Sequence, residues 1–568
     1  MEQPENPEKS RKSKFLYMKT KLSLLLFFLV VVLTTYAQQT ADSRRFVDAS
    51  KPDNSGDGGS WATAKRDIQV AIDEIQSPSG VQIWIKGGVY YPTASPNMTA
   101  NGTTGTLPLT NRDKYILLKD GVSLYGGFAG NEVALSQRVL GNNLTYIDGD
   151  IGVANDISDN CYHLMVYLGN YTTTGITLDG LTFRNANAQR RSGSTDPFES
   201  TIINANGFDN YIPRRLGGVY LDRGLNSFIN NCVFENNTAE NRASGLYTTG
   251  GFGTTCSFTV SNSYFVNNLL TLSTYGAWAT EQCKAFCYNN VFYGNKNSDF
   301  QYGSGAALFL NTSQSEVINC SFVNTQSYNG GSVFIVPSGT LPTKFSNCIF
   351  YGTTRNASFS GTKGYDFETS NTTYEITAKN CSFIHPAANY TSANQNILSA
   401  TSSGNIYQQN PSFSNINNIK GTDNKYFTAD DGLALLSSSQ CKNTGLNSEI
   451  PSSAVNGPFP DITGANRILA ATTDMGAYEI DGAVLNSVSF EKIGAKLYPN
   501  PTNNSITLEL NDFSFTKVSL FNLQGSIIQN VTMNSNTTTL DVSNLTTGIY
   551  LVKIETEEGT AVQKIIKK

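Results

Sequence analysis

The chain has 568 residues, of which only 15% are charged, and its formal net charge is −5 at pH 7. This balance provides no basic surface for nucleic acid, so nucleic acid is not expected as a partner. The two histidines, His163 and His385, leave little for His-based catalytic triads or zinc sites. Low charge combined with 49 Gly, 28 Tyr and 31 Phe is typical of an extracellular all-β protein with many turns.

Residues 1–37 predict a signal peptide. Two lysines precede the apolar run Leu22–Leu33, and small residues near Ala37 fit a cleavage site. The run is too short for a convincing transmembrane helix. We therefore expect a mature chain that begins near Gln38 and has no integral membrane span.

The next elements are a first strand at Phe46–Asp48 and a helix over Trp61–Gln76. Within that helix, apolar residues recur on one stripe formed by Ile68, Ala71, Ile72 and Ile75. A single amphipathic helix ahead of a repeat region predicts a cap over the open apolar end of a stack.

A short motif, Asn-x-x-Phe, organises the centre of the chain. Successive Phe residues lie 31, 27, 30, 28, 33 and 30 positions apart, a spacing typical of repeat architectures. The seven copies are Asn231–Phe234, Asn262–Phe265, Asn289–Phe292, Asn319–Phe322, Asn347–Phe350, Asn380–Phe383 and Asn410–Phe413.

The motif has the pattern of a bend followed by a strand. Asn tolerates the left-handed region, while the second and fourth positions share one face of an extended chain. The fourth is always Phe and the second is usually Cys, whereas the third varies and is expected on a more exposed face. One such strand per coil of about 30 residues predicts a parallel β-helix in which Phe stacks on Phe about 4.8 Å apart. A helical solenoid is the rival, but long stretches with a 3.6-residue period are absent.

Seven of the nine cysteines fall into two groups. Cys232, Cys320, Cys348 and Cys381 occupy the second motif position and are interpreted as small core residues. The remaining cysteines of the repeat region lie outside the motif and are the better disulfide candidates: Cys256, Cys283 and Cys287.

Four segments carry a resemblance to known proteins: Ser60–Ala64, Gln82–Pro92, Lys119–Phe128 and the closing segment Asp474–Glu479. Through them the chain resembles secreted bacterial right-handed β-helix proteins of the pectin-lyase-like superfamily. The resemblance implies a right-handed parallel β-helix over residues 38–480, in agreement with the general handedness of parallel crossovers. The superfamily includes polysaccharide lyases and hydrolases, but the resemblance identifies a fold better than an activity.

A second pattern follows a linker at residues 481–495. Several short alternating strands between 496 and 568 predict a small β-sandwich. The distinctive residues of this region are Pro499, Asn500, Pro501, Gly548, Tyr550, Lys553, Lys564, Lys567 and Lys568. With them the region strongly resembles the C-terminal sorting domain of the type IX (Por) secretion system of Bacteroidetes. The resemblance implies the secretion machinery as a partner and a secreted or outer-membrane surface-attached protein.

The lyases of the resembled superfamily hold Ca²⁺ with carboxylates and use Arg or Lys as a base, which makes Ca²⁺ the one candidate cofactor. Asp148 and Asp150 could share a face and bind a cation, although Asp-Gly-Asp is also ordinary turn chemistry. An insertion at residues 185–223 interrupts the repeat, and a solvated loop is the alternative for it. It contains the candidate catalytic residues Arg190, Arg191, Arg214 and Arg215.

Aromatic residues near the coils suggest a ligand-binding face. Outward rings can bind sugars, although ordinary strand residues are the alternative. The candidates are Tyr264, Tyr275, Trp278 and Tyr293. The sequence contains no unambiguous catalytic constellation, so enzyme status stays open. The leading hypothesis is a surface or secreted solenoid that binds glycans or other surfaces in an adhesin-like role. The alternative is a polysaccharide lyase or glycoside hydrolase.

Overall fold

The computed structural model describes residues 43–568 apart from 77, 97–99, 103–104, 170–174, 191–198, 206–207, 251–255, 273–274, 298–304, 313, 329–330, 338–342, 356–365, 372, 392–393, 395–396, 454–456, 459, 481–489, 491–493, 512–516, 523–526, 534 and 557–558. The chain forms two compact units, one ending at Glu479 and the other made of Ile480–Lys568 with Leu436–Ser438. The expected signal peptide lies outside the described residues.

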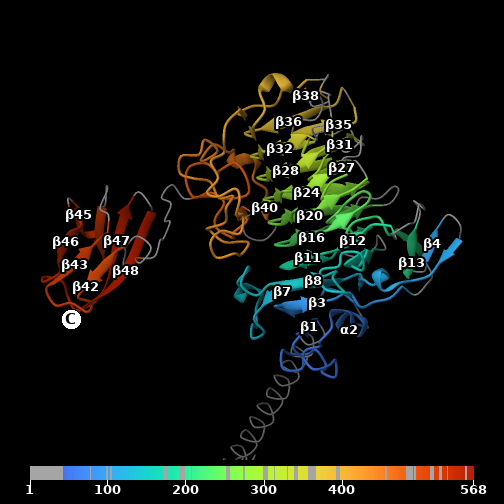
Figure 1. The fold of residues 1–568 in the computed structure, drawn as a ribbon, viewed down its shortest axis with the longest axis horizontal. Helices are drawn as coiled ribbons and strands as arrows, with labels where there is room; N and C mark the ends of the chain where they lie inside the picture. The colour runs from blue at the N-terminus through green and yellow to red at the C-terminus, as the bar shows by residue number, and fades with distance from the viewer. Residues whose placement is uncertain are drawn as a thin grey trace, which may run out of the picture. The chain divides into compact units, whose positions relative to one another are not determined.

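The first unit is a parallel β-helix, as predicted (Figure 1). Each regular coil adds one parallel strand to each of three long sheets. In stacking order, sheet 1 consists of β1 (Arg44–Val47), β2 (Val81–Lys86), β7 (Val122–Phe128), β10 (Thr177–Asp179), β16 (Ser227–Asn230), β20 (Ser257–Ser261), β24 (Lys284–Tyr288), β28 (Gln314–Ile318), β32 (Lys344–Ser346), β36 (Glu375–Lys379) and β38 (Ile397–Leu398). Sheet 2 consists of β3 (Gly88–Tyr90), β8 (Thr145–Asp148), β11 (Leu181–Arg184), β17 (Val233–Glu235), β21 (Tyr264–Val266), β25 (Val291–Tyr293), β29 (Ser321–Val323), β33 (Ile349–Tyr351), β37 (Ser382–Phe383) and β39 (Ile406–Tyr407).

Sheet 3 consists of β6 (Ile116–Leu118), β9 (Met165–Leu168), β15 (Val219–Asp222), β19 (Leu246–Thr249), β23 (Trp278–Glu281), β27 (Leu308–Thr312), β31 (Val333–Pro337) and β35 (Phe367–Thr369). A fourth ladder of short strands lies between sheets 2 and 3 in chain order: β12 (Asn187–Ala188), β18 (Thr238–Ala239), β22 (Leu269–Leu270), β26 (Lys296–Asn297), β30 (Gln326–Ser327) and β34 (Thr354–Arg355). The remaining short elements of this unit are η1 (Asn111–Asp113), η2 (Leu135–Gln137), η3 (Ala387–Asn389), η5 (Asn447–Glu449), β40 (Ser452–Ser453) and β41 (Gly457–Pro458).

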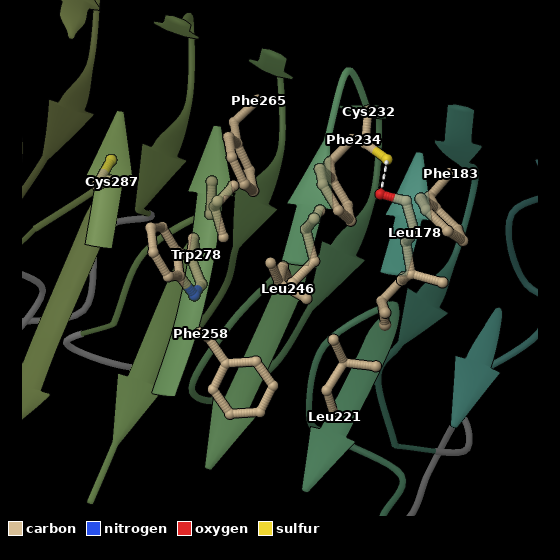
Figure 2. Packing of buried hydrophobic residues seen from close by; sticks show 14 of the residues in the cluster. Leu178, Phe183, Leu221, Cys232, Phe234, Leu246, Phe258, Phe265, Trp278 and Cys287 are labelled. Carbon is tan, nitrogen blue, oxygen red and sulfur yellow. Dashed lines mark hydrogen bonds between the residues drawn. The ribbon is translucent and has the colours of Figure 1, made fainter. Parts of the chain in front are cut away.

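The motif phenylalanines form a continuous column inside the solenoid (Figure 2). Phe234, Phe265, Phe292, Phe322 and Phe350 pair in register on sheet 2. Their ring centroids are 4.7–4.8 Å apart, with interplanar angles of 3–9°. In-register parallel strands therefore bring identical rings into stacking distance.

The column differs from the sequence prediction at its last member. Phe413 does not continue it, because Tyr407 on β39 pairs with Phe383 and stacks on it at 5.7 Å. At the other end the column extends to Phe183, which stacks on Phe234 at 5.2 Å. The closing coil is shorter than the regular spacing of the motif. The spacing therefore predicted Phe413 at the position that Tyr407 occupies.

The motif asparagines adopt the expected left-handed backbone, with φ between 48° and 55° at all six from Asn231 to Asn380. A second asparagine ladder lies inside the solenoid and was not predicted. Asn237 Nδ2 donates to Asn268 Oδ1 at 3.1 Å, and Asn268 Nδ2 donates to Asn295 Oδ1 at 3.0 Å. Buried amides stacked in this way satisfy one another from coil to coil.

The predicted N-terminal cap is present, but its helix is much shorter than the sequence pattern suggested. α2 spans only Ile68–Asp73, instead of Trp61–Gln76. The apolar stripe is nevertheless buried in the core of the solenoid. Burial of this stripe, rather than helix length, closes the first coil.

The expectation of disulfides at Cys256, Cys283 and Cys287 is wrong. All nine cysteines are free and buried. Cys287 Sγ lies 3.6 Å from Cys320 Sγ, which is packing contact rather than a bond. Cysteines outside the motif serve the same purpose as those within it, as small core residues.

The described residues of 414–435 and 439–479 form a strap along the outside of sheet 2 (Figure 1). The motif asparagines hold it through donation to main-chain carbonyls. Asn289, Asn319, Asn347 and Asn380 bind the carbonyls of Pro460, Asp474, Leu446 and Thr444 at 2.7–3.2 Å. The variable third motif position is therefore buried, from Val233 to Ser382, and the prediction of a more exposed face was wrong.

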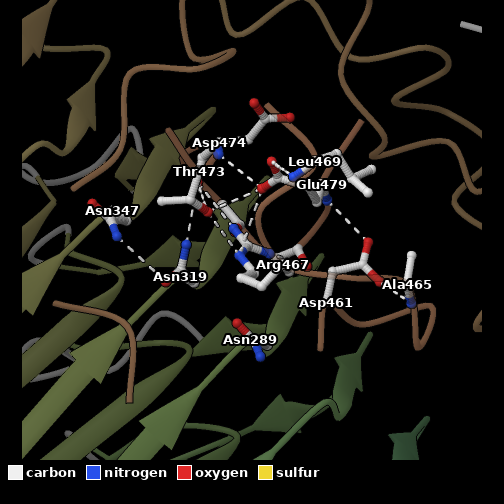
Figure 3. A network of polar contacts seen from close by, with 12 residues as sticks. Asn289, Asn319, Asn347, Asp461, Ala465, Arg467, Leu469, Thr473, Asp474 and Glu479 are labelled. Carbon is white, nitrogen blue, oxygen red and sulfur yellow. Dashed lines mark hydrogen bonds and ion pairs between the residues drawn. The ribbon is translucent and has the colours of Figure 1, made fainter. Parts of the chain in front are cut away.

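Buried charged residues stabilise the strap through contacts within it (Figure 3). Arg467 is buried and donates to the carbonyls of Asp474, Gly476 and Ala477 at 2.5–2.9 Å, and its Nε lies 3.8 Å from a Glu479 oxygen. Elsewhere on the strap, Asp431 accepts the hydroxyls of Tyr264 and Tyr478 at 2.6 and 3.0 Å. The hydrogen bond from Tyr264 to Asp431 joins the strap to sheet 2.

The C-terminal unit is the expected small β-sandwich. One antiparallel sheet contains β42 (Lys496–Tyr498), β43 (Ser505–Glu509) and β46 (Thr537–Asp541), and the other contains β45 (Ile527–Thr532), β44 (Lys517–Phe521), β47 (Gly548–Thr556) and β48 (Gly559–Lys567). Their inner faces form a separate core that includes Leu508, Val518 and Val552.

The first prediction concerns the column. Phe292→Ala removes a ring stacked on both sides and should destabilise the protein by about 3–5 kcal/mol. Phe286→Ala is the matched control, because Phe286 lies half-exposed on the outer face of the same coil. Urea unfolding should give a much lower midpoint for Phe292→Ala; equal losses from the two variants would contradict the stacked column.

The second prediction concerns Asp431. Burial raises the pKa of its carboxyl from an ordinary value of 3.8 to about 6. The folded protein therefore keeps a proton that the unfolded chain has released, and stability should fall as pH rises from about 4 to 6. Asp431→Asn should flatten this part of the pH profile of the melting temperature.

Asp430→Asn provides the control, because burial acts to raise the pKa of the neighbouring Asp430 but hydrogen bonds from Thr422 and Thr428 together lower it below its ordinary value. That group should contribute the opposite slope, with stability lost as pH falls. An unchanged slope in Asp431→Asn would rule out the assigned burial effect.

Candidate functional site

The outer face of sheet 3 carries two parallel rows of side chains. The inward residues of each strand join the solenoid core, and alternate residues point outward. One outward row is largely aromatic, made of Val166, Tyr220, Tyr247, Ala279, Phe309 and Phe334. The second row lies two residues further along each strand and is mainly polar, made of Asp222, Thr249, Glu281 and Asn311.

Glu281 is the centre of a carboxylate–arginine–tyrosine cluster. One of its oxygens accepts both the Tyr247 hydroxyl and Arg242 Nη1, and the other accepts the Tyr275 hydroxyl at 3.2 Å. The Tyr275 ring packs on Phe309 at 3.9 Å. Of the three guanidinium nitrogens of Arg242, only Nη1 donates to a residue in the part of the chain that the structure describes, and the side chain is 38% exposed. The cluster therefore presents guanidinium donors to solvent.

Asp222 lies at the equivalent place on β15. Its Oδ2 pairs with Arg223 Nε at 3.0 Å, and Arg223 Nη2 donates to Asn210 Oδ1 at 2.5 Å. Burial raises the pKa of the Asp222 carboxyl to about 6. A carboxyl in this range holds a proton in mildly acidic solution and can release it near neutrality.

The register places the two carboxylates on one line. Asp222 pairs with Thr249, and Thr249 pairs with Glu281. With about 4.8 Å between neighbouring strands, the Cα atoms of Asp222 and Glu281 lie roughly 10 Å apart. Arg223 and Gln282, which follow them, adopt φ values of 58° and 59°, so the chain turns sharply at the same place in both coils.

The insertion with the predicted catalytic arginines forms an antiparallel sheet and is not the solvated loop that was the alternative. The insertion forms β13 (Ser200–Ala205) and β14 (Phe208–Pro213), which pair with β4 (Ala100–Gly102) and β5 (Gly105–Leu107) beside sheet 3. Arg214 is fully buried and forms a two-point contact with Asp113 at 2.7 and 2.8 Å. Arg190 and Arg215 both pair with the buried Glu240, and Arg191 lies outside the described residues. These arginines anchor the insertion, and the solvated-loop interpretation fails for Arg214.

The predicted aromatic binding row is not assembled as one exposed face. Tyr264 and Trp278 are buried, and Trp278 points into the solenoid core (Figure 2). Tyr293 lies under the strap, where its hydroxyl donates to the Ile416 carbonyl at 2.9 Å. Tyr275 alone among the four belongs to the outer face of sheet 3.

The two predicted metal ligands have different surroundings. Both carboxylate oxygens of Asp148 accept hydrogen bonds from other side chains, one from Arg184 Nε at 2.7 Å and the other from Asn185 Nδ2 at 2.8 Å. Asp150 accepts the Asn155 amide at 2.9 Å through Oδ2, and its Oδ1 is buried without a partner. In the described part of the chain, no group of three His, Cys, Asp or Glu residues is arranged to hold a metal ion.

Sequence reasoning missed Asp222, Glu281, Arg242 and Tyr247. Their signal is a second periodic pattern, in which an outward residue is followed two positions later by a polar one: Tyr220-Leu-Asp222, Tyr247-Thr-Thr249, Ala279-Thr-Glu281 and Phe309-Leu-Asn311. The pattern is hidden because its members vary far more than the motif phenylalanines.

Several of the predicted sorting residues make hydrogen bonds or ion pairs within the C-terminal unit. Asn500 Nδ2 donates to the Lys564 carbonyl at 2.8 Å, and Asn500 Oδ1 accepts the Ile566 amide at 2.9 Å. Pro499 and Pro501 flank Asn500, and both follow cis peptide bonds. Gly548 begins β47, and the Tyr550 hydroxyl donates to the Thr546 carbonyl at 2.9 Å. Lys553 pairs with Glu555 at 2.8 Å, Lys567 is buried, and Lys564 and Lys568 are exposed.

Residues 496–568 match the family model described as a secretion system C-terminal sorting domain. The domain marks the protein as cargo of the type IX secretion machinery, and the protein is secreted or attached to the outer surface of the cell. Among the described helices, none is long and apolar enough to span a membrane.

Part of the chain is similar in sequence to a pectate lyase. The chain is 30% identical over 162 residues to pectate lyase PEL9 of Emericella nidulans, which is 26% of this chain and 39% of that protein. The match thus spans about two fifths of the length of this curated relative. Comparison with the crystal structure of pectate lyase Pel9A gives 12% identity and a TM-score of 0.32, covering 77% of this chain and 96% of that one.

Proposed function

We propose that this secreted β-helix protein binds an acidic polysaccharide through the outer face of sheet 3. The observation that carries the proposal is the partly exposed side chain of Arg242 within the Glu281–Tyr247–Tyr275 cluster. Arginine suits the carboxylates of uronic acid units, because it donates several hydrogen bonds in a fixed plane. Tyrosine hydroxyls and the half-buried Tyr275 ring add polar and apolar contacts suited to sugars.

Two further features support this assignment. Export by the sorting domain brings the solenoid to extracellular polymers. The partial similarity to pectate lyase PEL9 favours pectate, a polymer of uronic acid, as the first ligand to test. A solenoid face of repeated strands also offers successive sites along its axis for a linear chain.

Cleavage of the bound chain is the second candidate function. The similarity to a pectate lyase and the position of Asp222 near Glu281 favour it. Asp222, with a pKa of about 6, has the properties of a general acid, while Glu281 is held among cationic and hydroxyl donors. Inverting hydrolases separate their carboxyl groups by about 6.5–9.5 Å, a spacing compatible with strands two coils apart.

The third prediction tests binding. Arg242→Gln in the full mature chain should weaken binding to polygalacturonate by about tenfold or more, because a charged hydrogen-bonding partner is lost. Lys284→Gln removes the same charge from the exposed outer face of sheet 1 and should leave binding unchanged. Isothermal titration against polygalacturonate, with a neutral polysaccharide as the second ligand, measures both effects.

The outcomes separate the two functions. Binding without shortened or unsaturated products supports recognition, whereas new reducing ends or unsaturated sugars support cleavage. Loss of cleavage in Asp222→Asn, with binding retained, would assign the acid role to Asp222. Equal binding by wild type and Arg242→Gln would refute the proposed face.

A further inference from the structure

The segment Glu240–Arg242, called the 240–242 segment below, carries Arg242 with an unusual backbone. Arg242 has a φ of 64°, and this left-handed conformation is uncommon for a large side chain. Its amide donates to Asn241 Oδ1 at 2.9 Å. Such a conformation persists only where the surrounding structure holds the chain in place. The contacts of the 240–242 segment therefore decide where the Arg242 guanidinium lies.

Main-chain hydrogen bonds hold the segment from two sides. The Glu240 amide donates to the Ala188 carbonyl at 3.0 Å, and the Asn241 amide donates to the Arg215 carbonyl at 2.9 Å. On the other side, the Leu272 amide donates to the Glu240 carbonyl at 3.1 Å. Ala188 and Arg215 both belong to the insertion. The insertion therefore supports the backbone that carries the binding arginine.

The Glu240 side chain adds an ion-pair network with two arginines of the insertion. Glu240 is only 4% exposed. One of its carboxylate oxygens pairs with Arg190 Nη2, and the other lies 3.4 Å from Arg215 Nε and accepts the Arg190 amide at 3.1 Å. Loss of this carboxylate would leave two largely buried cations uncompensated beside the 240–242 segment, which favours a local rearrangement.

Arg242 is thus attached to two different parts of the solenoid. Its backbone follows Glu240, which is tied to the insertion, whereas its Nη1 donates to Glu281 and to the Tyr247 hydroxyl on sheet 3. A charged hydrogen bond to a ligand depends strongly on the direction of the donor. The orientation of the guanidinium on the surface therefore depends on both attachments.

We propose that Glu240 is a positioning residue, which holds Arg242 in the orientation that binds an acidic polysaccharide; this inference rests on the function proposed for the outer face of sheet 3. It also gives a different role to two arginines that the sequence suggested as catalytic. Arg190 and Arg215 affect the ligand through Glu240 and Arg242, and their side chains hold the 240–242 segment in place.

Electrostatics alone predicts the opposite effect of removing the Glu240 charge. The ion pairs around the site join three arginines, Arg190, Arg215 and Arg242, to two glutamates, Glu240 and Glu281. Removal of one negative charge here should attract a polyanion more strongly if only the net charge mattered. A positioning role predicts weaker binding instead, because Arg242 loses its fixed orientation. The sign of the effect therefore separates the two explanations.

The fourth prediction uses Glu240→Gln in the full mature chain, with polygalacturonate as the probe. Isothermal titration should show binding weakened by about fivefold or more, because Arg242 is misplaced. In the Arg242→Gln background, the same change should alter the affinity by less than about twofold, since Glu240 acts through Arg242. Tighter binding by Glu240→Gln, or equal losses in both backgrounds, would overturn the proposal.

Chemical labelling of Arg242 by phenylglyoxal tests the positioning role without any ligand. Peptide mapping by mass spectrometry should show severalfold faster labelling of Arg242 in Glu240→Gln than in the wild type, because the guanidinium is released from its partners. If this increase occurs but the wild type does not bind polygalacturonate, the positioning role stands and the proposed ligand is wrong. An unchanged labelling rate would refute the positioning role.

Glu235→Gln is the matched control, because it removes the same charge from a largely buried carboxylate that contacts Lys420 and Tyr426 of the strap. It should leave both the labelling of Arg242 and the affinity for polygalacturonate unchanged. Circular dichroism establishes that each variant is folded. If Glu240→Gln does not fold, Arg190→Gln replaces it in the labelling experiment, with the same expected increase and the same contradicting result.

Discussion

Stacking of identical rings on neighbouring coils is the interaction on which the solenoid depends. A parallel β-helix has no single centre, so each coil must bury its apolar face against the next. The phenylalanine column does this with rings 4.7–4.8 Å apart in the central coils, close to the spacing of strands in a sheet. The backbone register and the preferred ring distance therefore reinforce each other.

The motif asparagine serves two purposes at once. Its left-handed backbone makes the bend between sheets 1 and 2, and in the later coils its side chain holds the strap. Because the strap follows the same edge, it covers residues that would otherwise be exposed, such as Tyr264 and Ile349. The same repeat thus forms the solenoid and also the surface against which the strap packs. Sheet 3 lies on another side of each coil, and there the Arg242 side chain reaches the surface beside the largely buried carboxylate of Glu281.

The repeat region was predictable because one large residue type recurs at a nearly constant interval. The sandwich was predictable because several short alternating strands follow one another between 496 and 568. The resemblance to a sorting domain was recognisable because Pro-Asn-Pro and the lysine-rich end are specific. The strap was not, because residues 414–480 have no period and their contacts are carbonyls that any residue supplies. For the same reason Tyr264 was taken for an exposed ring. The sheet 3 cluster was missed because Glu281 and Arg242 lie 39 positions apart and meet only through the register. Arg214 was misplaced because a buried ion pair with Asp113 leaves no local pattern in the sequence.

The most direct test of the ring column is a pair of double-mutant cycles by urea unfolding. Phe265 and Phe292 are in contact on adjacent coils, whereas Phe234 and Phe350 are four coils apart. Column stacking predicts a coupling free energy of about 0.5–1.5 kcal/mol for Phe265→Ala with Phe292→Ala, and a value near zero for Phe234→Ala with Phe350→Ala. Additive effects in both cycles would contradict it.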